Sequence, residues 1–128
     1  MAVTHITSLR NTLADAVTTA LGASPRLVFR LSGTVSAPGT AVATLVMSAT
    51  PFGAASGGTI TANAITSDTA ATGNASPVAN ATLQTSGGTV LVHCAVAASA
   101  SDINMTGGLT IGAGDTVSCS SLTYSAPA

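Results

Sequence analysis

The sequence predicts a mainly β protein: an antiparallel β-sandwich or jelly-roll-like domain preceded by one N-terminal amphipathic helix. Three observations support this prediction. Apolar residues follow a helical period only in residues 4–21, period-two alternation begins after Pro25, and turns rich in Gly, Asn and Ser then recur at roughly ten-residue spacing. The 128 residues are enough for one ordinary domain. We therefore expect a single domain over residues 1–128, with the sandwich spanning 26–125.

The helix is predicted over residues 4–21. Its start can be capped by Thr4 or Thr7, whose hydroxyl would accept from an unpaired first-turn N–H group. Gly22 tolerates a left-handed helix end, and Pro25 cannot continue a helix. These residues therefore set both ends of the predicted element.

One apolar stripe follows this helix, because its apolar residues fall mostly at spacings of three and four. The stripe consists of Ile6, Leu9, Leu13, Ala16, Val17, Ala20 and Leu21. The opposite face carries Asn11, Asp15 and Thr18. Two interpretations stay open: the stripe docks on the domain's own sheet, or it packs on another subunit.

The rest of the chain reads as short strands joined by polar turns. The expected strands are residues 26–32, 41–48, 59–66, 78–85, 89–97, 109–111 and 116–124. In the first of these, Leu27, Phe29 and Leu31 share one face of the strand. The segment 86–88 is typical of a hairpin turn, and 67–77 and 98–108 are expected to be loops.

Charged residues make up only 5% of the chain, whereas a typical soluble domain has about 25%. They are Arg10, Arg26, Arg30, Asp15, Asp68, Asp102 and Asp115, and the chain contains neither Lys nor Glu. The surface must therefore consist largely of hydroxyls, methyls and backbone, with a net charge of -1. Such a surface has little to keep copies apart and favours packing between subunits, although a biased composition is the alternative explanation.

The composition also argues against several classes of partner. The most apolar run, 90–98, is interrupted by His93 and is far shorter than the roughly 18 residues of a membrane span. Three Arg and no Lys cannot form a patch that follows nucleic-acid phosphates. Residues 1–23 lack the basic start and compact apolar stretch of a signal peptide, so we expect the protein to be made and assembled in the cytoplasm.

Enzymatic chemistry is not expected. The chain has no Glu, and Asp68, Asp102 and Asp115 lie in turn-like stretches where an Asx turn explains them. His93 and Cys94 are adjacent, so a regular strand would point them to opposite faces and away from a shared metal ion.

Cys94 and Cys119 behave most simply as small buried hydrophobes, with a disulfide between them left open. His5, near the expected helix start, adds nothing to a metal or catalytic cluster. No cofactor or metal is therefore predicted.

Several segments together resemble the small virion structural proteins encoded in the head regions of tailed phages and prophages. They are 51–73 (PFGAASGGTITANAITSDTAATG), the helix 6–21, 101–105 (SDINM), 111–118 (IGAGDTVS) and 122–124 (LTY). The resemblance covers nearly the whole chain through turns and strands rather than catalytic motifs. It implies a minor capsid, cement or decoration protein in the virion, in contact with the major capsid protein or neighbouring virion subunits.

We expect such a subunit to stabilise the head shell as a homo-oligomer, with a trimer favoured. The candidate assembly contacts are Ile6, Leu9, Leu13, Val17 and Phe52. The alternative is a tail, collar or head-fibre attachment protein that binds a receptor or glycan through the loops 66–76 and 99–107. The absence of Trp and the single Tyr speak against that alternative, because sugar-binding faces favour stacking aromatics.

Overall fold

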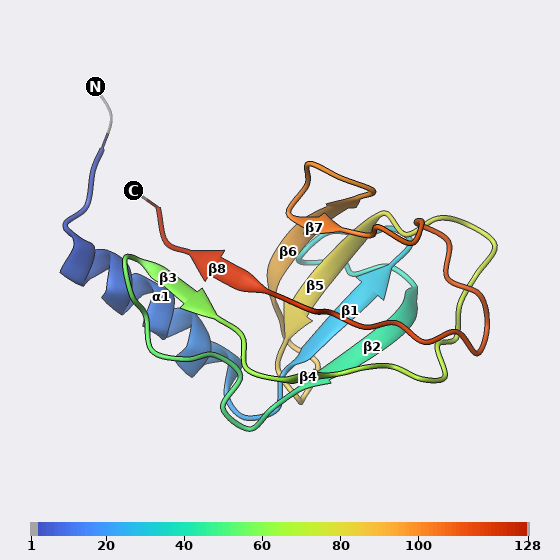
Figure 1. Cartoon of the computed structure of the whole chain (residues 1–128), viewed down its shortest axis with the longest axis horizontal. Coiled ribbons are helices and arrows are strands. Elements are labelled where there is room, and N and C mark those ends of the chain that lie inside the picture. The colour runs from blue at the N-terminus through green and yellow to red at the C-terminus, as the bar shows by residue number, and fades with distance from the viewer. Residues whose placement is uncertain (1–2, 128) are drawn as a thin grey trace.

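The computed structural model describes residues 3–127 and contains one helix and eight strands within them (Figure 1). The elements are α1 (Thr7–Leu21), β1 (Arg26–Arg30), β2 (Ala41–Met47), β3 (Thr59–Thr61), β4 (Ile65–Thr66), β5 (Asn80–Gln84), β6 (Val90–Ala97), β7 (Ile103–Asn104) and β8 (Thr123–Ser125). The mainly β class with one N-terminal helix is therefore confirmed.

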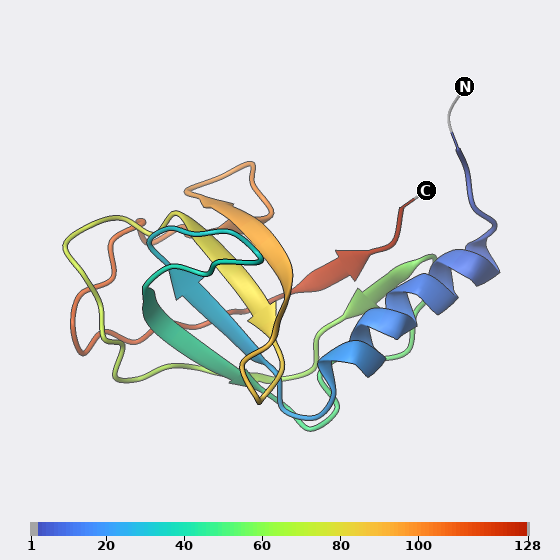
Figure 2. The same cartoon turned by 180° about the vertical axis from the view of Figure 1, so that it is seen from behind.

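The strands form two sheets of unequal size. The larger has six strands in the order β4-β2-β1-β5-β6-β7, and the smaller consists of β3 and β8. All pairs are antiparallel except β6 and β7, which are parallel. Figures 1 and 2 show the curled large sheet at one end of the molecule and α1 lying along the small sheet at the other. This arrangement is compatible with a sandwich or jelly roll without establishing either.

The core lies against one face of the large sheet. Leu27 on β1 is in register with Leu45 on β2 and Leu83 on β5, and each of the three is at most 2% exposed. Phe29, two residues further along β1, is buried on the same face. The alternation in 26–32 thus predicted the inward face of this central strand correctly.

The other face of β1 is organised by Arg30. Its guanidinium donates to Thr82 Oγ1 (3.1 Å) and Gln84 Oε1 (2.7 Å) on β5, and to the carbonyl oxygen of Gly39 (2.8 Å) in the β1–β2 connection. Burial lowers the pKa of this guanidinium from its ordinary value. The side chain therefore fastens the connecting loop to the sheet.

The helix starts differently from the prediction. Ile6 takes the N-cap position in an extended conformation, and no side chain in the described residues caps this end. Capping by Thr4 or Thr7 is therefore wrong: the first helical turn bonds instead to the carbonyl of Ile6, which accepts from the N–H groups of Leu9 and Arg10. Gly22 does end the helix, at φ 71°, and donates its N–H to Thr18.

The strands beyond residue 50 differ more from expectation. The predicted strand 59–66 is divided into β3 and β4, which belong to different sheets. Residues 109–111 form no strand, the strand predicted at 116–124 is reduced to β8, and β7 lies inside an expected loop.

Long-range backbone bonds explain these differences. The N–H of Val78 donates to Leu109, and Asp68 and Val117 exchange a pair of backbone bonds. These segments bond to one another through isolated bonds and one isolated bridge, so they do not build ladders.

Candidate functional site

Polar side chains fasten α1 to the body of the protein. Asn11 Oδ1 accepts from the N–H of Gly58 (2.7 Å), and Asp15 Oδ1 accepts from the N–H of Ala55 (2.9 Å). Arg10 donates to the carbonyl oxygens of Ala126 and Pro127, both at 3.3 Å. These three side chains, spaced over less than two turns of the helix, thus hold the loop before β3 and the segment after β8.

The predicted placement of polar side chains opposite the apolar stripe is confirmed, but the side of the helix that docks on the body is the polar one. Asn11 and Asp15 lie on the side that docks, and Thr18 is half-buried. The physical reason is that the 55–58 turn offers N–H groups that need acceptors, and a helix can supply them only from short polar side chains. Ala14 and Leu21 are buried beside these contacts.

The outer face of α1, which we define as the N-cap residue Ile6 together with Leu9, Leu13, Ala16 and Ala20, is exposed. Ile6 is 73% exposed, Leu9 44% and Leu13 39%. Ala16 and Ala20 are exposed as well. Figures 1 and 2 show that α1 lies at the end of the molecule, on the opposite side of the small sheet from the large one. The described residues of this chain thus leave the apolar stripe of α1 partly exposed.

The structure brings together three of the five predicted assembly contacts. Ile6, Leu9 and Leu13 share the outer face. Val17 turns inward and packs partly buried against the core. Phe52 is only 2% exposed and lies in a bridge with Ala62, so it belongs to the interior of this chain. Spacing alone could not separate Val17 from the outer residues, because it is adjacent to them on the helix.

Comparison with family models, with curated proteins and with solved structures finds no significant match for this chain. The choice of a candidate site therefore rests on the geometry of this chain.

The charged side chains serve the fold. Each of the three Arg side chains donates to backbone carbonyls or neutral side chains, and each of the four Asp side chains accepts from backbone N–H groups. Asp68 accepts from Ala70, two residues on, which is the predicted Asx turn, and also from Thr44 on β2. Asp102 reaches back to Ala95 on β6. The charged side chains thus all have contacts within the fold, and Asp15, Asp102 and Asp115 are exposed as well.

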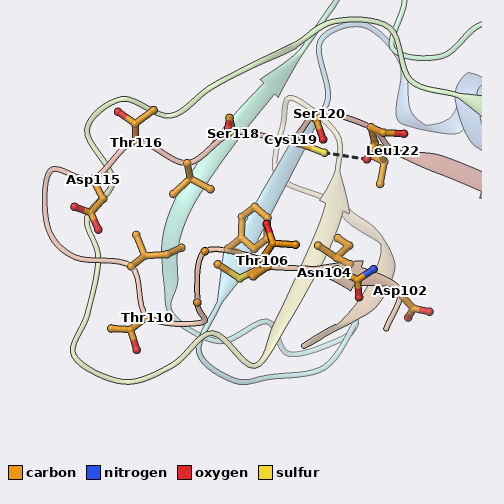
Figure 3. Close-up of a pocket in the computed structure, with 18 of the residues that line it drawn as sticks. Asp102, Asn104, Thr106, Thr110, Asp115, Thr116, Ser118, Cys119, Ser120 and Leu122 are labelled. Carbon is orange, nitrogen blue, oxygen red and sulfur yellow. Dashed lines mark hydrogen bonds between the residues drawn. The ribbon is translucent and has the colours of Figure 1, made fainter. Parts of the chain in front are cut away.

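A second feature is an open cavity of about 670 Å³ beside the large sheet (Figure 3). Phe29 lines it from β1, and the remaining lining residues all come from the segment 102–123. The labelled side chains around it include Asp102, Asn104 and Thr110, together with Ser118 and Ser120. Its volume lies within the roughly 300–1,000 Å³ typical of small-molecule sites.

The two thiols are poorly suited to covalent chemistry. Burial, with a further contribution from the charge of Asp102, raises the pKa of Cys94 to about 11. Burial also raises the pKa of Cys119, whose Sγ donates to the carbonyl of Ser121 (3.3 Å) beside the cavity. Both cysteines are free, and both thiols are protonated at neutral pH.

Other expected features are placed as follows. On β6, His93 is exposed while Cys94 is half-buried, so the two side chains alternate as predicted. Among residues 3–127, no three His, Cys, Asp or Glu side chains gather in a way that would hold a metal ion. Over the same residues, no helix is both long enough and apolar enough to cross a membrane.

Proposed function

We propose that this protein is a structural subunit of a tailed-phage particle, most specifically a cement or decoration protein that reinforces the head shell. The observation that carries the proposal is the outer face of α1, an apolar stripe that is exposed on a chain in which only 5% of the residues are charged. Covering such a stripe with another protein surface removes apolar area from water and so stabilises an assembly.

The contribution of this subunit would come from contact area. Apolar surface removed from water stabilises an assembly by roughly 25 cal/mol per Å². Small hydroxyl and methyl side chains lose little conformational entropy when a contact immobilises them. β4 and β7, the outermost strands of the large sheet, can offer backbone groups to a neighbour. The partner in this role is the major capsid protein or a neighbouring virion subunit.

The test is to look for the protein in particles. Phage particles would be purified on a density gradient from the culture that produces the chain, and their proteins quantified by mass spectrometry. We expect many copies per DNA-filled head, in a constant ratio to the major shell protein. Recovery of the chain only from the free protein fraction would contradict the proposal.

The cavity favours a second candidate, an attachment protein of the tail, collar or head fibre that binds a glycan. Its rim offers carboxylate, amide and hydroxyl groups from Asp102, Asn104 and Thr110, which are the groups that hydrogen-bond sugars. A glycan array would test it, with Asn104→Ala as the variant expected to weaken a genuine signal. Array binding that an excess of the free sugar does not displace would reject this candidate.

A further inference from the structure

We propose that the outer face of α1 packs against the same face of a second copy of this chain, forming a small bundle of helices. This names a partner surface for the proposed assembly role. It rests on the proposed function because it takes the stripe to be covered during assembly. Self-association in solution and presence in particles are measured by separate experiments.

The spacing of the outer face points to a helix as its occupant. Successive members of the series Ile6, Leu9, Leu13, Ala16, Ala20 are separated by three, four, three and four residues. This is the heptad a/d pattern, in which each side chain inserts between four residues of a facing helix. The inward residues Ala14 and Leu21 lie outside that series and are buried by the chain itself. The helix thus has one apolar face for its own core and a second with the period of helix-to-helix packing.

The charges around the stripe are compatible with an identical partner. Only two side chains of α1 are charged, and both are bound to the chain's own backbone: Arg10 to Ala126 and Pro127, and Asp15 to Ala55. The neighbouring positions Thr12 and Thr19 donate their hydroxyls to carbonyls of the helix itself. Two copies would therefore meet without like charges at the seam, which is what a self-complementary contact requires.

The position of the helix gives a partner access. The contacts of Asn11, Asp15 and Arg10 with the body fix the rotation of α1 about its axis, so the stripe is held outward. At the end near Gly22, Ala16 and Ala20 are small enough to let a second backbone approach closely. The larger Ile6, Leu9 and Leu13 provide most of the apolar area at the other end.

The available area sets the expected strength. A 15-residue helix is roughly 22 Å long, and a stripe roughly 10 Å wide along it covers on the order of 200 Å². A standard interface buries about 800 Å² on each partner. A pair of helices alone falls well short of this value. A bundle of three, in which each helix touches two others, buries more of each helix than a pair does, and we expect it to associate weakly, at micromolar rather than nanomolar concentration.

Sedimentation velocity of the full chain, from low to high micromolar concentration, tests the proposal. We expect the wild type to shift from monomer to oligomer across this range. Leu9→Gln combined with Leu13→Gln should remain monomeric, because Gln keeps helix propensity and removes the apolar seam. The matched control, Ser8→Gln combined with Thr19→Gln, alters two exposed positions on an adjacent face and should associate like the wild type.

A gain-of-function variant guards against a loss caused by misfolding. Ala16→Leu adds apolar volume to the seam at an exposed position, and it should lower the dissociation constant by about tenfold. Circular dichroism would verify that each variant retains its fold. A wild type that stays monomeric throughout, or a dissociation constant that neither Leu9→Gln with Leu13→Gln nor Ala16→Leu changes, would overturn the proposal. If the chain associates through α1 but is absent from particles, only the proposed phage role is overturned.

Discussion

The two faces of α1 use similar residues for different purposes. Leu21 on the inner face is 1% exposed and packs in the core, whereas Leu13 on the outer face is 39% exposed. The difference lies in the polar neighbours: Asn11 and Asp15 find backbone donors in the body, and this fixes which side of the helix turns inward. Apolar spacing thus identifies faces that become buried, and polar contacts decide whether the chain itself or another molecule buries them.

The largest effect should separate these two leucines. Leu21→Ala leaves a cavity in the core, and we expect the free energy of unfolding to fall by about 2–5 kcal/mol. Leu13→Ala removes a half-exposed side chain, and in the monomer it should change that free energy by less than about 0.5 kcal/mol. Urea denaturation at a concentration where the protein is monomeric compares them. Equal losses would show that the outer face also belongs to the core.

A smaller effect should follow from the polar contact that orients the helix. Asn11→Ala leaves the buried N–H of Gly58 without its acceptor, which costs about 1–3 kcal/mol. Hydrogen exchange of the Gly58 amide should become faster. Thr12→Ala, one residue away and exposed, serves as the control. Unchanged protection of Gly58 in Asn11→Ala would mean that this contact does not hold the helix.

The rate of thiol alkylation should distinguish an exposed position on α1 from the half-buried Cys94 on β6. Since the pKa of Cys94 is raised from 9.0 to about 11, its thiolate fraction near pH 8 is roughly a hundredfold below that of an unperturbed thiol. The thiol introduced by Leu13→Cys should alkylate far faster in the monomer, as peptide mass spectrometry would show. Equal rates at the two positions would contradict the burial of Cys94.

The same pKa shift predicts a weak pH dependence of stability. The thiol deprotonates more easily in the unfolded chain, so its contribution is complete below about pH 9 and is lost as the pH rises toward 11. Cys94→Ala should therefore flatten the stability profile in that window. A profile that Cys94→Ala leaves unchanged above pH 9 would refute this assignment.

Local signals made part of the fold predictable. Gly22 ends the helix where its backbone freedom suggested, the alternation around Leu27 and Phe29 identified the central strand, and 86–88 forms the turn between β5 and β6. In each of these the deciding residues lie within a few positions of one another, so the chain itself carries the information.

The remaining features depend on distant partners. β7 exists because Ile103 pairs in parallel with Val96, and a two-residue strand has no periodicity to detect. Likewise, Ile6, Leu9 and Leu13 were predicted as contacts, but only the docking of Asn11 on the 55–58 turn distinguishes them from Val17. The cavity, formed mostly by residues 102–123 beside Phe29, has no signal in the sequence that we recognise.

The most direct test of the division between the two faces is the dependence of the melting temperature on protein concentration. A chain whose folded form associates is stabilised by mass action, so the melting temperature of the wild type should rise with concentration. Leu21→Ala should have a lower melting temperature at every concentration, but that temperature should still rise with concentration. For Leu9→Gln with Leu13→Gln, the melting temperature should no longer depend on concentration. A wild-type melting temperature that stays constant over a hundredfold change in concentration would contradict the account.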